Sequence, residues 1–208
     1  MRLLYAASLG LALTTLSFAG TVVFTETGVG SGSIGAITFN DAAFTLTEIG
    51  DTSSRTLFDI DGTFYPGVYY IPGTSASISI SGLGTFSILS PMLTFGNQPN
   101  EAAGMGAFGP GGPGTIGGQS YLGDILDLPS AAFGSWDMLT SIGPISGTGE
   151  SFTPTFLTTG GSAVLNSVTG DTEFTATVVP EPTSNILLLS GMLVMAFVAR
   201  KHNFKKRA

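Results

Sequence analysis

Residues 75–80 read SASISI, and this alternation decides the expected fold class. Successive side chains of an extended strand point to opposite faces, so the isoleucines would lie on one face and serine hydroxyls on the other. The stretch from Phe174 to Val178 repeats the pattern with apolar side chains alternating with threonine. Both stretches therefore predict strands with one buried face.

Short runs of the same kind recur along the chain, and glycine or proline separates most of them. They cover residues 21–25, 34–39, 43–49, 56–60, 68–71, 75–80, 85–89, 92–95, 121–128, 132–140, 152–158, 163–168 and 172–179. Between the two ends of the chain, no window shows the 3.6-residue period of an amphipathic helix. We therefore expect an all-β domain of about ten to thirteen short strands, packed as an antiparallel β-sandwich or jelly roll.

A glycine-rich segment interrupts this rhythm. Residues 104–118 contain eight glycines and two prolines in fifteen positions, a composition typical of flexible chain. The segment has no lysine and precedes no credible helix, so a nucleotide-binding loop is a poor alternative. We expect a mobile surface loop between two halves of the sandwich, residues 21–95 and 121–179.

The first nineteen residues have the pattern of a secretory signal peptide. Arg2 precedes an apolar run from Leu3 to Leu16, and Ser17-Phe18-Ala19 places small residues at the positions that signal peptidase recognises. We expect cleavage after Ala19 and export of the remaining chain. An N-terminal anchor is the alternative, although the apolar run is short.

The last thirty residues have the pattern of a membrane anchor. Residues 183–199 carry no charge, and a helix over about 184–199 would span roughly 25 Å, close to a thin hydrocarbon core. The basic tail, residues 200–208, follows at once. By the positive-inside rule it would stay cytoplasmic and stop the helix in the membrane. Its basic residues are Arg200, Lys201, Lys205, Lys206 and Arg207.

Pro180, Glu181 and Pro182 stand directly before this apolar segment. The order of proline-glutamate-proline, apolar helix and basic end resembles the PEP-CTERM sorting signal. The resemblance implies processing by an exosortase, a membrane-embedded protease of Gram-negative bacteria that produce exopolysaccharide. It divides the chain into a signal peptide (1–19), a β domain (20–178) and a sorting segment (179–208), and implies delivery to the cell surface or the extracellular matrix. The alternative is an ordinary C-terminal anchor.

The exported part is acidic and has few of the usual catalytic side chains. Between residues 20 and 179, Arg55 is the only basic residue against 13 acidic ones, a formal charge of −12. Such a surface repels nucleic acid and accepts cations. The chain has no cysteine, and its one histidine, His202, lies in the basic tail, so zinc thiolate sites and histidine-dependent triads are excluded from this part. We expect no enzymatic activity.

Acidic residues offer the candidates for a metal site. Asp59 and Asp61 alternate in an extended segment, so their carboxylates could bind Ca²⁺ while Gly62 makes the turn. The ordinary explanation is a polar strand end that enters a turn, and calcium binding is the alternative to it. Asp124 and Asp127, three residues apart, would face opposite sides of a strand and form a weaker pair. A carboxylate-based glycoside hydrolase stays as an alternative, although no particular pair of acids can be chosen for it.

Aromatic residues offer candidates for sugar contact. Trp136 is the only tryptophan, and Tyr70 belongs to a cluster of tyrosines near Pro66. A core position explains Trp136 as well. The resemblance, together with the scarcity of catalytic side chains, implies a structural or adhesive protein associated with exopolysaccharide or biofilm, with a lectin-like carbohydrate-binding module as the alternative.

Overall fold

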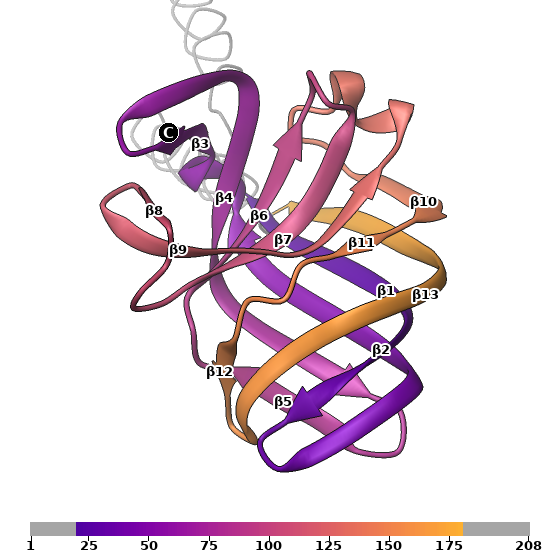
Figure 1. Ribbon diagram of the computed structural model, residues 1–208. Helices are drawn as coiled ribbons and strands as arrows, with labels where there is room; N and C mark the ends of the chain where they lie inside the picture. The colour runs from indigo at the N-terminus through magenta and orange to yellow at the C-terminus, as the bar shows by residue number, and fades with distance from the viewer. Residues whose placement is uncertain (1–19, 181–208) are drawn as a thin grey trace, which may run out of the picture. The chain divides into compact units, whose positions relative to one another are not determined.

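The computed structural model describes residues 20–180, and the strand pairings defined in this range are antiparallel (Figure 1). Two short 3₁₀ helices, η2 (Thr52–Ser54) and η3 (Ala131–Ser135), interrupt the strands. The strands are β1 (Gly20–Ile34), β2 (Ile37–Asp51), β3 (Thr56–Ile60), β4 (Thr63–Ile80), β5 (Gly84–Ile88), β6 (Met92–Asn97), β7 (Ala102–Phe108), β8 (Gly114–Ile116), β9 (Gln119–Pro129), β10 (Ile142–Thr148), β11 (Glu150–Ser151), β12 (Phe156–Thr158) and β13 (Gly161–Pro180). The expected all-β, antiparallel class is confirmed.

The strand order runs β11-β9-β7-β6-β4-β2-β1-β13-β12-β5. β4 joins two regions of this path, because residues 68–72 pair with β6 whereas residues 73–80 pair with β2. β5 also pairs with β4, so the path returns on itself through β2, β1, β13 and β12. In Figure 1 the long strands β1, β2 and β13 cross the lower part of the domain, and β6 and β7 lie above them.

Two clusters of buried side chains lie on opposite faces of β6 and β7. Met92 of β6 and Met105 of β7 pack into the larger cluster, whereas Leu93 and Phe95 of β6 pack into the smaller one. Both strands are consequently buried along almost their whole length. A strand covered on both faces does not show simple alternation between apolar and polar residues.

The expected loop over residues 104–118 is wrong in its first third. Residues 104–108 belong to β7, which pairs with β6 on one side and β9 on the other. Residues 114–116 form β8. The glycine-rich segment therefore joins the two expected halves of the domain instead of separating them. The glycines of β7 have a steric explanation, because side chains of β9 occupy the space that a Cβ atom on Gly104 or Gly106 would need.

The strand expected over residues 132–140 is also wrong. Ser130 caps η3 by accepting a hydrogen bond from the Ala132 backbone N–H, and no strand is assigned between residues 130 and 141. The Trp136 indole N–H then donates to the Thr140 carbonyl at 2.9 Å. This local bonding favours a compact turn over extension.

Candidate functional site

Two bulges in β9 place three polar side chains on one face of the sheet. Tyr121 pairs with Phe108, Asp124 with Gly106 and Asp127 with Gly104, and the register shifts once between each successive pair. Paired residues share a face, and alternate residues of β7 do so as well, so the three side chains lie on the same side. The expectation that Asp124 and Asp127 face opposite sides is therefore wrong, because it assumed a regular strand.

Glycines of β7 make room for these side chains. A Cβ atom on Gly104 would lie 2.9 Å from Phe95 Cζ and closer still to Asp127 Oδ1. A Cβ atom on Gly106 would collide with the Tyr121 ring, 2.8 Å from its Cε2. The small residues of β7 thus allow the polar side chains of β9 to pack directly over the β7 backbone.

The three side chains line a pocket of about 360 Å³. This volume is within the range of sites for small ligands. The lining combines two carboxylates and two side-chain amides with aromatic and aliphatic groups: Phe58, Ile60, Val68, Phe95, Asn97, Asn100, Ala102, Tyr121, Asp124 and Asp127. Such a lining can contact the apolar carbon skeleton of a ligand and also form hydrogen bonds with its polar groups.

Burial controls the protonation of the two carboxyl groups. Burial, with further contributions from Asp124 and Glu150, raises the pKa of Asp127 to about 8. Burial also raises the pKa of Asp124, although the hydrogen bond from Tyr121 opposes this shift. Tyr121 donates its hydroxyl to Asp124 Oδ1, and burial followed by the charge of Asp124 raises the pKa of this phenol. The raised pKa of Asp127 favours its protonated form at neutral pH.

Asp127 also has an oxygen without a hydrogen-bond partner in the described structure. Its Oδ1 atom is buried over Gly104. A buried acceptor without a donor costs about 1–3 kcal/mol, so this atom lowers the stability of the fold. The carboxyl groups of Asp124 and Asp127 and the amides of Asn97 and Asn100 form the polar part of the pocket lining.

Two further carboxyl groups lie within the core. Glu26 of β1 and Glu48 of β2 are fully buried, and neither carboxyl group has a hydrogen-bond partner in the described range. Burial raises the pKa of Glu26 well above its usual value, and Asp127 adds to the shift. Burial likewise raises the pKa of Glu48, and Thr94 opposes the shift without forming a hydrogen bond of normal geometry. Burial therefore favours the neutral form of both groups.

Asp59 and Asp61 lie apart from this pocket lining and already bind protein groups. Asp61 and Gly62 have positive φ angles of 51° and 80°, which fits the two-residue turn between β3 and β4. Asp61 Oδ1 accepts from the backbone N–H and hydroxyl of Thr115, each at 2.9 Å, and Asp59 Oδ1 accepts from Gly117 N–H at 3.3 Å. These bonds tie the β3–β4 turn to β8. Calcium binding by the two aspartates stays a prediction.

The two aromatic candidates belong to different clusters. Trp136 is 4 % exposed and packs with Phe24, Phe133 and Phe174, so its ring offers no open face to a sugar. Tyr70 belongs to the smaller cluster and makes an edge contact with Phe58, which lines the pocket. Burial, then the charge of Asp59, raises the pKa of Tyr70. The structure therefore does not bring Trp136 and Tyr70 together, and neither residue is part of the pocket lining.

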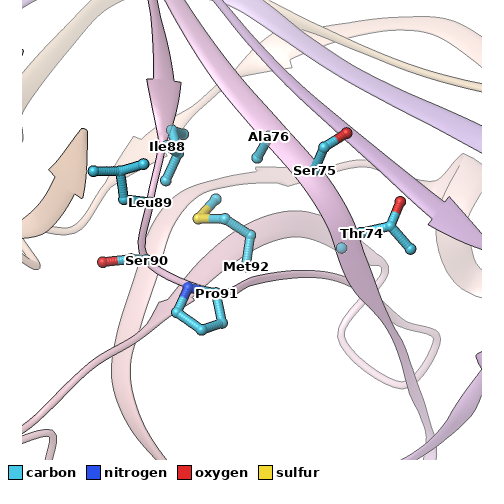
Figure 2. A pocket seen from close by; sticks show the side chains of 9 residues that line it. Thr74, Ser75, Ala76, Ile88, Leu89, Ser90, Pro91 and Met92 are labelled. Carbon is cyan, nitrogen blue, oxygen red and sulfur yellow. The ribbon is translucent and has the colours of Figure 1, made fainter. Parts of the chain in front are cut away.

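A second pocket, of about 260 Å³, lies between the middle of β4 and the connection from β5 to β6. Figure 2 shows Met92 between the segment carrying Thr74 and the segment carrying Ser90. None of its nine lining residues is acidic, basic or histidine. The Ser90 hydroxyl accepts from the Leu157 backbone N–H at 2.9 Å, so it is already used within the fold. This pocket defines no particular ligand chemistry.

The sorting residues lie almost entirely outside the described range. Pro180 is the last residue of β13. Glu181, Pro182 and the basic residues Arg200, Lys201, Lys205, Lys206 and Arg207 lie beyond it, as does the helix expected over about 184–199. The expected signal peptide, residues 1–19, lies outside it too. Among residues 20–180, no helix has the length and apolar character needed to span a membrane.

Comparisons with protein-family models, with curated proteins and with solved structures each give no match.

Proposed function

We propose that this chain is an exported protein of the cell surface or extracellular matrix, sorted by an exosortase and structural or adhesive in an exopolysaccharide layer. The observation that carries the proposal is the order of Pro180-Glu181-Pro182, an uncharged apolar segment and a basic end. Signal peptidase would remove residues 1–19, and the helix over about 184–199 would hold the precursor in the membrane until the exosortase acts.

The β domain supports this proposal through its chemistry. Residues 20–179 form one compact unit, with no cysteine or histidine and a single basic residue. A domain of this kind lacks cysteine, histidine and lysine among the side chains that serve as nucleophiles or general bases. We therefore favour a structural role over catalysis. The larger buried cluster, which includes Phe24 of β1 and Phe174 of β13 together with Met92 of β6 and Met105 of β7, supports a sandwich-like arrangement of the proposed jelly-roll type.

Intact-mass measurement of the mature protein from membrane and medium fractions tests the proposal. We expect a product that starts at Gly20 and ends near Pro182. Glu181→Ala should abolish C-terminal trimming and keep the protein in the membrane. Glu173→Ala, a change of the same type at an exposed position of β13, should leave processing intact. If the measured mass includes Ala208 in every fraction, the tail is an ordinary membrane anchor and the sorting proposal is wrong.

A second candidate function is carbohydrate binding, and the pocket beside β9 favours it. Carboxylate and amide groups next to aromatic walls suit the polar edges and apolar faces of a sugar ring. A glycan array with the wild type and a folded Asp127→Asn variant would test it. Specific binding that the variant loses supports a lectin-like module. The two carboxyl groups also suit the hydrolase alternative, which would require turnover of a glycan that disappears in the same variant.

A further inference from the structure

The acidic pocket has no basic residue of the domain to balance it. Arg55 is the only basic residue between positions 20 and 179. Its guanidinium donates to the Asp137 carbonyl at 2.9 Å and lies 4.4 Å from the centre of the Tyr69 ring. Arg55, Asp137 and Tyr69 are all absent from the pocket lining. Among the described residues 20–180, no side chain therefore supplies a positive charge to this pocket.

The two carboxyl groups of the pocket offer acceptor oxygens once they are ionised, and Asn97 and Asn100 add side-chain amides to the lining. Asp127 Oδ1 is buried without a donor, and Asp124 accepts only the Tyr121 hydroxyl among its described contacts. The Asn97 side-chain oxygen accepts from the Asn100 backbone N–H at 3.1 Å, which fixes the turn that carries both amides. An ammonium group has three N–H donors and no acceptor, so it complements this set better than a neutral hydroxyl does.

The remaining walls are apolar and closely packed. Phe58 makes edge contacts with Phe95 and Tyr121, with ring centres 6.3 and 6.1 Å apart. These rings suit a compact carbon frame and add attraction for a cation near their faces. Within residues 20–180, no group of three or more acidic, histidine or cysteine side chains is arranged to hold a metal ion. The combination therefore favours an organic cation over a metal.

We propose that this pocket binds a primary ammonium group carried on a compact ring, as in an amino sugar. The proposal deepens the carbohydrate-binding candidate and rests on it, since both require the pocket to be a ligand site. The ammonium would donate to Asp127 and Asp124, and the ring would lie against Phe58. Where Asp127 carries a proton before binding, that proton leaves to solvent as the ammonium takes its place.

Isothermal titration calorimetry of the full-length protein in detergent at neutral pH tests the ligand class. The probes are glucosamine, N-acetylglucosamine, glucose, cyclohexylamine and calcium chloride. We expect glucosamine and cyclohexylamine to bind and the two neutral sugars to show no heat of binding. Binding of cyclohexylamine without glucosamine supports an ammonium site but removes sugars as its source, and with them the carbohydrate-binding candidate.

Three other outcomes overturn the proposal. Equal binding of glucosamine and N-acetylglucosamine would show a neutral carbohydrate site, so that the inference fails while the carbohydrate-binding candidate survives. Binding of calcium alone would show a metal site. Absence of binding by every probe would overturn both the inference and the carbohydrate-binding candidate, and would leave export and sorting untouched.

Three variants test whether glucosamine binds in this pocket. Asp127→Asn keeps the size of the side chain and should weaken glucosamine binding at least about tenfold, because an uncharged amide replaces the acceptor. Asn100→Lys changes an exposed residue at the rim and should abolish binding by supplying the missing cation from the protein. Asp171→Asn makes the same change of net charge at an exposed position outside the pocket lining and should leave the affinity unchanged. An equal loss in Asp171→Asn would show non-specific attraction to an acidic surface and overturn the proposal.

Discussion

At the scale of single residues, Glu26 and Glu48 stand out because they lie in the core of the domain without hydrogen-bond partners in the described structure. Glu48 Cγ lies so near β4 that a Cβ atom on Gly73 would be 2.8 Å from it. Each unsatisfied carboxyl group costs stability, because it gives up its hydration on burial and gains no bond in return. These two residues therefore lower the stability of the fold that contains them.

We predict that Glu48→Met raises the free energy of unfolding by about 1–3 kcal/mol, because it removes an unpartnered polar group and roughly keeps its volume. Urea denaturation at neutral pH measures the change. Glu48→Gln, which keeps a polar group at the same place, should remain close to the wild type. A destabilised methionine variant beside an unchanged glutamine variant would show that the carboxyl site has a polar partner, contrary to this account.

The sequence contains a signal for these glutamates, but none for the aspartates of the pocket. Glu26 continues the phase of Val22 and Phe24, so an acidic residue stands where an apolar one is expected. Asp124 and Asp127 share a face only because an extra residue lies between them in β9. A bulge depends on pairing with β7, and the sequence of β9 alone does not reveal it.

At the scale of elements, β7 shows that a glycine-rich segment, whose composition predicts a loop, can form a strand between two other strands. Glycine is a weak strand former, and so many glycines together predict a loop. In the fold, β7 lies between β6 and β9, and its glycines leave space for the Asp127 carboxyl group and the Tyr121 ring. The preference of a strand for larger residues is overridden because the neighbouring strand already fills that space.

We predict that Gly104→Ala lowers the free energy of unfolding by about 1–3 kcal/mol, because the added Cβ meets Asp127 and the Leu126 carbonyl and forces β7 and β9 apart. Thermal and urea denaturation measure the loss. Gly134→Ala is the matched control, since its Cβ would approach only the flexible Glu101 side chain, at 3.3 Å. Equal stability of the two variants would mean that β7 does not pack against β9 as described.

At the scale of the whole molecule, the antiparallel β class follows from alternation and from glycine or proline at the junctions. The way in which the strand path closes does not follow from these sequence patterns. β4 reads as two separate runs, 68–71 and 75–80, yet it is one strand that passes from β6 to β2. β5 reaches β12 through residues about seventy positions apart, Ile88 and Thr158. Such contacts between distant segments depend on the assembled core, whereas alternation records only which face of a strand is buried.

The buried acids make the stability of the whole domain depend on pH. In the folded protein the pKa of Asp127 is about 8, and burial also raises the pKa of Asp124, Glu26 and Glu48. In the unfolded chain these groups have ordinary values near 4. Between about pH 4 and 8 the folded state therefore binds more protons than the unfolded state, so stability falls as the pH rises, by up to about 1.4 kcal/mol per pH unit for each proton.

We therefore predict that the free energy of unfolding is larger near pH 5 than near pH 8, with the steepest loss between these values, where Asp127 is protonated in the folded protein and ionised in the unfolded chain. Urea titrations across this range measure it. Asp127→Asn cannot ionise and should flatten the slope, whereas Asp171→Asn, exposed and outside the pocket lining, should keep it. The excess of 13 acidic residues over one basic residue adds repulsion of the same sign, which salt screens, so the part of the slope that persists in high salt belongs to the buried acids. Stability that rises between these pH values would mean that the carboxyl groups are ionised and paired in the folded protein.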